Sequence, residues 1–441
     1  MTEKAPKVLT KVVPREQWSK LGFILAGIGS AVGLGNIWRF PYIAGQNGGG
    51  GFLLAYLISV LFLAFPLLLL EFAAGWKFQT SILSFFKKIG ARTRYLSWFF
   101  IFGGMAILSY YVVIVGWVFA YFIFSFTGYG TFAQFSGSYL PLVFFLICII
   151  ILFSVDSFGI KKGVEKMCMW IMPVMFVILV VLLIRALSLP NAMAGVSFFL
   201  RPDFTHFLDP RMWIFAFSQA FFSIGVGYGL LLTYASYADR MTDIPLSAIS
   251  ISVTDTIVSV LAGLIVFSLV FSFGLNPGEG PELAFVTLPK IFALIPFGRV
   301  FGAVFFLMLL LAGLTSAISI GEMGVSSLID EFGMTRKKAN TIIYGIALAA
   351  GLPSALSYSA FKLSLFGKPF LDHVDFFASS ILLPVAVLIF TIVVSWFWSS
   401  KAFIEAVNKH TKINMPHWII YIIRYLIPFA IFLVLMIGVM T

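Results

Sequence analysis

One apolar stretch near the start of the chain, residues 21–47, is long enough to cross a lipid bilayer but is unusually rich in glycine. It reads LGFILAGIGSAVGLGNIWRFPYIAGQN, with glycines at positions 22, 27, 29, 33 and 35. Glycine lowers helix stability by roughly 1 kcal/mol relative to alanine, so the cluster predicts a spanning helix that breaks inside the membrane. Lipid cannot hydrogen-bond to the freed backbone, so such a break must be buried in protein or line a polar cavity. The stretch therefore predicts backbone carbonyls that face a bound cation.

The rest of the chain has the composition of a membrane protein. Of its 441 residues, 61% are hydrophobic and 11% are charged, and the mean hydropathy is +1.04. Apolar runs predict eleven spans, at 21–44, 52–75, 95–126, 139–156, 167–188, 211–236, 245–273, 300–328, 339–358, 376–398 and 417–440. Residues 1–20 lack a signal-peptide pattern. We therefore expect an all-α membrane protein with one transmembrane domain over residues 1–441.

The distribution of basic residues predicts the orientation of the chain. Lysine and arginine are more numerous in loops on the side of the N-terminus, which predicts a cytoplasmic N-terminus in a multi-pass cell-membrane protein. An odd number of spans places the C-terminus outside the cytoplasm. The net charge of +11 is spread over these loops, so it does not indicate nucleic-acid binding.

A second glycine cluster lies five spans after the first. Gly225, Gly227 and Gly229 fall in the middle of the predicted sixth span. Two interrupted spans at matching positions predict inverted repeats with a transport site between them. Residues 21–188 would form one repeat of five helices and residues 211–398 the other, with 417–440 as an eleventh helix. The alternative is that the glycines only allow close helix packing.

Ionisable side chains inside spans are costly and usually mark function. Arg39 and Asp375 fall on the outer side, where they could meet as a gate. Asp255 in the seventh span is the strongest signal for a cation. Glu71 is predicted to accept hydrogen bonds from N–H groups released by a broken helix. Glu322 either lines an inner exit path or lies near the membrane interface.

The eighth span supplies hydroxyl oxygens at Thr315 and Ser316. These can bind a cation, or they can simply hydrogen-bond to their own helix. The sequence contains no evident nucleophile with a base and no metal cluster, so we do not expect an enzyme.

Several motifs together resemble one family. They include GSAVGLGNIWRFP at 29–41, LLLLEFAAG at 67–75, QAFFSIGVGYG at 219–229, AGLTSAIS at 312–319 and DHVDFF at 372–377. The chain resembles prokaryotic neurotransmitter:sodium symporters, which have the LeuT fold: a 5+5 inverted repeat with helices 1 and 6 broken, plus further helices. The resemblance implies symport by alternating access.

The resemblance also implies two sodium sites. The first uses Ala31, Asn36, Ser223 and Asp255 together with the substrate carboxylate. The second uses carbonyls of Gly29, Val32 and Ala312 with the hydroxyls of Thr315 and Ser316. All are hard oxygen donors, as sodium requires.

The implied substrate site lies between the two breaks. Its residues are Ala31, Gly33, Leu34, Gly35, Ile107, Tyr111, Phe222, Ser223, Gly225, Val226, Tyr228, Ser316, Ala317 and Ile320. The outer gate maps onto Arg39, Asp375 and Gln219 with Phe222 as lid. The inner gate maps onto Arg15 and Asp330, with Trp18 packing over it.

Two features refine the expected function. Asp255 stands where chloride-dependent members have asparagine, and a built-in carboxylate supplies the charge that chloride would bring, so we expect no chloride requirement. The side-chain pocket has no fixed charge, which favours neutral, hydrophobic amino acids, aliphatic to aromatic. The alternatives are the same fold with another substrate, such as a betaine or other amine, proton coupling, or a non-transporting amino-acid sensor. The sequence leaves the oligomeric state open.

Overall fold

The computed structural model describes residues 15–90, 93–128, 130–205, 207–277 and 283–440. Nine helices within these ranges are long and apolar enough to cross a membrane, and one bent pair of helices meets the same test together. The strands β1 (Ser364–Leu365) and β2 (Lys368–Pro369) form a two-stranded antiparallel hairpin. The prediction of an all-α membrane protein is confirmed.

In the first half of the chain the helices are α1 (Lys20–Ala31), η1 (Gly35–Arg39), α2 (Phe40–Gln46), α3 (Gly50–Ser59), η2 (Val60–Ala64), α4 (Phe65–Phe78), α5 (Ile82–Ile89), η3 (Thr93–Tyr95), α6 (Leu96–Thr127), α7 (Phe132–Ser136), α8 (Leu140–Ser157), η4 (Ile160–Glu165), α9 (Lys166–Leu187) and α10 (Ala192–Leu200). In the second half they are α11 (Pro210–Ile224), α12 (Leu230–Ala235), α13 (Ile244–Ser272), η5 (Leu283–Thr287), α14 (Leu288–Leu294), α15 (Gly298–Phe332), α16 (Arg336–Ser357), α17 (Phe370–Asp375), η6 (Phe376–Leu382), α18 (Leu383–Phe397), α19 (Ser400–Val407), α20 (Ile419–Tyr421), η7 (Ile422–Leu426) and α21 (Ile427–Met440).

These helices occupy all eleven predicted spans, although some boundaries differ. The predicted start of the tenth span at residue 376 is wrong, because helix α17 already begins at Phe370 and continues through η6 into α18. The first turns of this helix carry Asp372 and Asp375, which line a cavity and therefore do not face lipid. Charged residues that ended the apolar run in the sequence thus did not end the helix.

Local chemistry explains where several helices begin. The Ser19 side chain accepts a hydrogen bond from the Gly22 N–H at 3.0 Å, ahead of α1. Asp243 caps α13 in the same way by accepting from the Leu246 N–H at 3.0 Å. Such caps satisfy N–H groups that have no partner within the helix.

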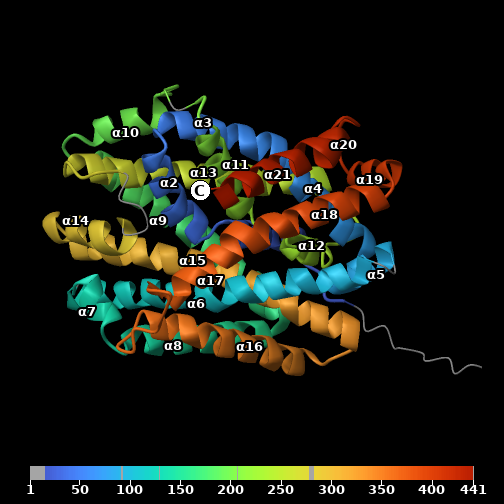
Figure 1. The fold of residues 1–441 in the computed structure, drawn as a ribbon, viewed down its shortest axis with the longest axis horizontal. Helices are drawn as coiled ribbons and strands as arrows, with labels where there is room; N and C mark the ends of the chain where they lie inside the picture. The colour runs from blue at the N-terminus through green and yellow to red at the C-terminus, as the bar shows by residue number, and fades with distance from the viewer. Residues whose placement is uncertain (1–14, 91–92, 129, 206, 278–282, 441) are drawn as a thin grey trace, which may run out of the picture.

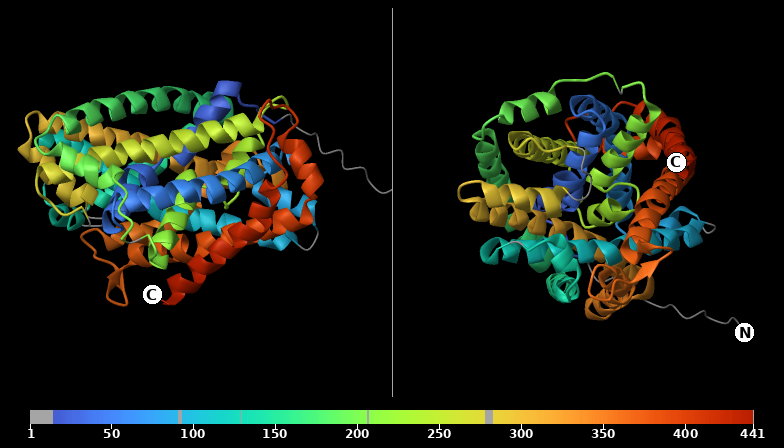
Figure 2. Two further views of the ribbon diagram at one scale, coloured as in Figure 1. Left: turned by 90° about the horizontal axis from the view of Figure 1, so that it is seen from above. Right: turned by 60° about the vertical axis from the view of Figure 1, so that its left-hand side comes forward.

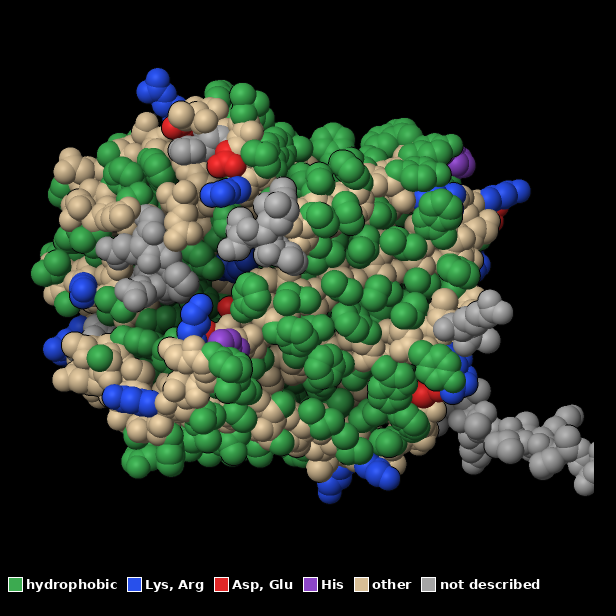
Figure 3. Space-filling model, in the orientation of Figure 1, with side chains coloured by type: hydrophobic (Ala, Val, Ile, Leu, Met, Phe, Trp, Pro, Cys, Tyr) green, Lys and Arg blue, Asp and Glu red, His purple; other side chains and the backbone are tan. Residues whose placement is uncertain are grey.

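The long helices run roughly along one axis of the molecule (Figure 1). Helix α6 packs along α15, and α8 and α16 pack against this pair. In the right-hand view of Figure 2 the blue N-terminal helices lie among later helices. In Figure 3, apolar side chains cover a broad middle region, and most charged side chains lie toward the two ends. This is the surface expected of a membrane-spanning bundle. Below, the end at which residue 15 enters is called the N-terminal face.

Candidate functional site

The first span is broken as predicted. Helix α1 ends at Ala31, η1 begins at Gly35, and the two parts are bent by 48°. At the break the Gly33 N–H donates to Asn36 Oδ1 at 3.0 Å instead of to a helical carbonyl. The Asn36 N–H donates to the Gly33 carbonyl at 3.2 Å. Both N–H groups are thus diverted from the carbonyls four residues earlier, which belong to Gly29 and Val32.

The sixth span is broken by its three glycines. Helix α11 ends at Ile224 and α12 begins at Leu230. Between them, Gly225, Gly227 and Gly229 have φ angles of 74°, 99° and 80°. Only glycine adopts this left-handed region readily. The alternative that these glycines serve only helix packing is therefore wrong for this span.

Glu71 on α4 satisfies the backbone at this second break. Its carboxylate accepts hydrogen bonds from the N–H groups of Gly227, Gly229 and Leu232, the last at 3.0 Å. The side chain is fully buried. The predicted role of Glu71 as an acceptor for a broken helix is confirmed.

One cluster of oxygen atoms lies between the first break and helix α15. Ser316 Oγ is 3.1 Å from the carbonyl oxygen of Ala312, 3.3 Å from that of Val32 and 3.5 Å from that of Gly29. Thr315 Oγ1 is 3.0 Å from the same Ala312 oxygen. Both hydroxyls can donate within their own helix, as the alternative interpretation expected.

The composition of this cluster nevertheless fits a cation. Ser316 has one hydroxyl proton and can satisfy only one of the three carbonyls around it. The Gly29 and Val32 carbonyls have lost their helical partners at the break. The hydroxyl lone pairs of Thr315 and Ser316 remain available, so the cluster presents more acceptors than donors. All five residues assigned to the second sodium site are brought together.

A second cluster surrounds the fully buried Asp255. Its carboxylate accepts from Asn36 Nδ2 at 2.6 Å and from the Ser223 hydroxyl at 2.8 Å. Among the described residues no lysine, arginine or histidine forms an ion pair with it. An unpaired buried carboxylate is costly, and a cation beside it would remove that cost.

The side chain of Asn36 differs from the implied arrangement. Its amide nitrogen also lies 2.7 Å from Ser223 Oγ and 2.9 Å from Ser259 Oγ, while its oxygen accepts from Gly33. The amide oxygen that the resemblance directs to sodium thus faces Gly33. The reason is electrostatic: the Asp255 carboxylate attracts the N–H end of the amide.

Tyr56 belongs to this cluster and was missed in the sequence. Its hydroxyl lies 3.3 Å from Asp255 Oδ2 and 3.2 Å from Ser223 Oγ. Tyr56 sits in an apolar run of the second span, where a tyrosine resembles an ordinary core or lipid-facing aromatic. No pattern in the sequence distinguished it.

A small cavity of about 50 Å³ lies between the two breaks. It is lined by Ser30, Ala31, Gly33, Gly35, Ile107, Tyr111, Phe222, Gly225, Tyr228, Leu230, Ser316 and Ile320. None of these described lining residues carries a charged side chain. The predicted residues Val226 and Ala317 are buried but do not line this cavity. Ser223 belongs to the Asp255 cluster instead, and Leu34 lines the larger cavity described next. Ser30 and Leu230 were not predicted.

A larger cavity of about 610 Å³ opens beyond the small one, and Gly35, Tyr111 and Phe222 line both. Arg39 and Asp375 line the larger cavity but form no ion pair in the part of the chain that the structure describes. Arg39 Nη1 instead donates to Gln219 Oε1 at 2.7 Å, and its guanidinium lies 4.8 Å from the centre of the Phe222 ring. The predicted outer gate residues are neighbours, but the pair is open.

The N-terminal face is closed. Arg15 Nη1 and Asp330 Oδ2 form an ion pair at 2.8 Å. Trp18 is buried beside it and donates its ring N–H to the Tyr234 carbonyl at 2.9 Å. All three predicted inner gate residues therefore meet at one place.

Comparisons with known proteins agree with this architecture. The family model described as the sodium:neurotransmitter symporter family matches residues 15–140 and 141–441. A sodium-dependent transporter of Methanocaldococcus jannaschii is 38% identical, over 94% of this chain and 88% of its own length. A sodium-dependent transporter of Bacillus subtilis is 35% identical, over 96% of this chain and 98% of its own length.

Among solved structures, that of MhsT in complex with L-phenylalanine superposes with a TM-score of 0.88 and 36% identity. It covers 96% of this chain and 100% of its own. Together with the fold and the two broken spans, these relatives identify the class as sodium-dependent membrane transporters with the LeuT fold, and not enzymes. The chain belongs to the sodium:neurotransmitter symporter family.

Proposed function

We propose that this protein carries a neutral, hydrophobic amino acid across the cell membrane together with sodium, without a need for chloride. The observation that carries the proposal is the small cavity: it has no charged lining, and an acceptor-rich cluster lies on each side of it. A zwitterionic ligand fits there because its two charges can be matched by backbone groups and bound cations.

The break in the first span would hold the substrate carboxylate. The Leu34 N–H donates to the Tyr111 hydroxyl oxygen at 3.3 Å. Tyr111 lines the small cavity, so its hydroxyl proton can be donated to an anion there. The start of a half-helix also favours a negative charge. The substrate ammonium would meet carbonyls near Phe222, in the unwound part of the sixth span.

The rest of the cavity would receive the side chain. Ile107, Ile320 and the aromatic ring of Tyr228 offer apolar contacts, and a Cβ built at Gly225 meets no atom within 4 Å. There is thus room for a larger side chain at this point. MhsT, the structural neighbour, was solved in complex with L-phenylalanine, which supports an aromatic or aliphatic substrate.

The two oxygen clusters would bind one sodium ion each. Asp255, Ser223, Asn36 and the Ala31 carbonyl would bind the first ion with the substrate carboxylate. The cluster of Thr315 and Ser316 would bind the second. With the N-terminus in the cytoplasm, the open Arg39–Asp375 pair and the closed Arg15–Asp330 pair correspond to an outward-facing arrangement, which supports transport by alternating access.

A competition series tests the substrate class. Purified protein binding a labelled hydrophobic amino acid in sodium should lose the label to leucine, phenylalanine or methionine, and not to glutamate or lysine. The reason is that an unpaired charge in the small cavity is costly. Tight binding of glutamate, lysine or a betaine would overturn the proposal. Uptake into proteoliposomes that persists when potassium replaces sodium would contradict sodium coupling.

Removing the hydroxyls of the eighth span tests the second sodium site. The double change Thr315→Val and Ser316→Ala should lower sodium affinity by on the order of tenfold or more, since two ligands are lost at about 1 kcal/mol or more each. Sodium titration of substrate binding measures this. Ser326→Ala on the same helix, whose hydroxyl bonds to Met323 at 3.3 Å, is the control. Unchanged sodium dependence in the double variant would refute the assignment.

A further inference from the structure

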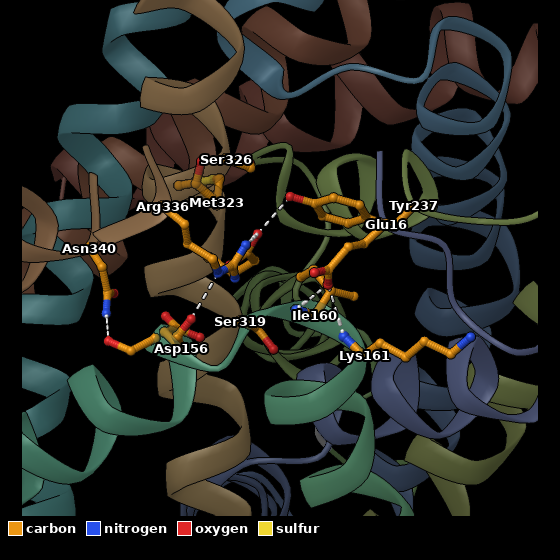
Figure 4. A network of polar contacts seen from close by, with 12 residues as sticks. Glu16, Asp156, Ile160, Lys161, Tyr237, Ser319, Met323, Ser326, Arg336 and Asn340 are labelled. Carbon is orange, nitrogen blue, oxygen red and sulfur yellow. Dashed lines mark hydrogen bonds and ion pairs between the residues drawn. The ribbon is translucent and has the colours of Figure 1, made fainter. Parts of the chain in front are cut away.

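A buried charge network on the N-terminal face has no role in the proposed site. It joins Asp156 at the end of α8 and Arg336 at the start of α16 (Figure 4) with Glu322 on α15. Arg336 forms an ion pair with Glu322, and its Nε donates to the backbone carbonyl of Asp156 at 2.8 Å. Glu322 also accepts from the Tyr237 hydroxyl at 2.6 Å. The sequence left two alternatives for Glu322, an inner exit path and the membrane interface. The side chain is fully buried, which fits the inner path.

Arg336 thus forms its ion pair with Glu322, whereas the Asp156 carboxylate forms none among the described residues. Asp156 is fully buried, and among the described residues one of its oxygens accepts from the Tyr344 hydroxyl alone, at 2.6 Å. Its other oxygen, Oδ1, is buried and has no hydrogen-bond partner within the described ranges. A buried carboxylate normally has several donors or a paired cation.

Among the residues that the structure describes, no further positive charge faces Asp156. The titratable groups that face it are Glu322 on α15, Arg336 and Tyr344 on α16, and Tyr234 on α12. On the following turn, η4, Lys161 and Lys162 are exposed, and Glu165 accepts from Ser19. Two buried carboxylates therefore share one guanidinium. An ionised Asp156 in this position would accept one hydrogen bond from a neutral donor and would share the charge of Arg336 with Glu322, whereas a protonated Asp156 carries no charge to compensate.

The network is connected to the inner gate through Tyr237. The Arg15 guanidinium lies 4.2 Å from the centre of the Tyr237 ring, and Trp18 packs edge-on against the same ring. The hydroxyl of that ring binds Glu322. Separation of Arg15 from Asp330 would release Tyr237 and admit water to the buried carboxylates.

We propose that Asp156 is a proton-binding site tied to the inner gate, which holds a proton while the gate is closed and releases it to water when the gate opens. The carboxyl O–H bond breaks, its electron pair remains on the carboxylate, and water accepts the proton. This inference rests on the proposed transport cycle for its gate.

The direction of the pH effect follows from the proton count. The closed state binds one proton more than the open state above about pH 4, the ordinary pKa of aspartic acid. Raising the pH therefore favours opening, by up to tenfold per pH unit, until Asp156 is ionised in the closed state as well. Asn at this position binds no proton and removes the effect.

The native thiol of Cys168 can report gate opening. It lies on α9, is 1% exposed, and a Cβ built at Gly29 of α1 would lie 3.2 Å from its sulfur. Movement of α1 would expose it. In full-length protein carrying Cys148→Ala, which removes the other cysteine, the rate of alkylation is measured from pH 5 to pH 9. Arg15→Ala, which removes the ion pair of the inner gate, should raise this rate. A raised rate would show that alkylation of the thiol reports gate opening.

The decisive quantity is the alkylation rate of the protein with Asp156 divided by the alkylation rate of the Asp156→Asn protein, because both contain the same thiol. This ratio should rise more than threefold over the pH range. Asp243→Asn, which keeps a good helix cap on the same face, should behave like the parent. A ratio that changes less than threefold overturns the proposal.

A second variant covers the case in which Asp156→Asn fails to fold. Tyr344→Phe removes the single donor to the Asp156 carboxylate, so the rise in alkylation should move to higher pH. An unmoved curve overturns the proposal. Alkylation requires neither substrate nor sodium. If the ratio depends on pH but the protein shows no uptake, the transport proposal alone is therefore rejected. If uptake is intact but the ratio does not change with pH, only the proton site is rejected.

Discussion

Replacing Glu71 with leucine should lower the free energy of unfolding by about 3–6 kcal/mol, because three buried N–H groups would lose their acceptor at about 1–2 kcal/mol each. Those groups belong to Gly227, Gly229 and Leu232 in the broken sixth span. The loss is large because lipid and the apolar core provide no replacement. Thermal unfolding of the purified protein in detergent measures the effect.

Two variants make this measurement specific. Glu71→Gln keeps one acceptor oxygen of nearly the same shape and should lose less stability than the leucine variant. Leu70→Ala, at a neighbouring buried position, reports the cost of an ordinary core truncation, about 2–5 kcal/mol. If Glu71→Leu unfolds at the wild-type temperature, the carboxylate does not support the break.

Replacing Asp255 with asparagine should abolish uptake in chloride-free buffer or make uptake depend on chloride. The wild-type protein should transport without chloride. Among the described residues the carboxylate is the one charged group in its cluster, and a unit charge about 4 Å from sodium contributes roughly 4 kcal/mol at an effective dielectric constant of 20. Sodium affinity should therefore fall by on the order of a thousandfold, as measured by sodium titration of uptake with gluconate replacing chloride.

The matched control is Asp209→Asn, the same chemical change at the cap of α11. It should leave the chloride response unchanged. A steep chloride requirement in the wild-type protein, or normal chloride-free uptake by Asp255→Asn, would show that Asp255 does not replace the anion.

Much of the fold was predictable because it depends on local chemistry. Apolar length determines a span, and glycine clusters determine where a helix cannot continue. Both breaks, at Val32–Leu34 and at Gly225–Gly229, therefore follow from the sequence. Glu71 was also predictable, because a charge in a run of leucines requires a partner and a broken helix provides N–H donors.

Other residues were not predictable because their partners are distant in the chain. Tyr56 meets Asp255 across 199 positions, and nothing in its own segment marks it as polar in function. Asp156 ends an ordinary apolar span, and only the packing of α8 against α15 and α16 places it beside Glu322 and Arg336. The orientation of the Asn36 amide likewise depends on the charge that the seventh span brings to it.

The sequence by itself determined the solvent, the two breaks and the family of this protein, since each depends on composition or on short motifs. Tertiary structure decided which acceptors gather around each break and which gate is closed. The physical reason is that the carbonyls released by the glycines in residues 21–47 can form a cation site only where side chains on other helices supply further oxygen atoms. Ser316 on α15 completes one oxygen cluster at the broken helix, and Asp255 on α13 completes the other, beside one cavity.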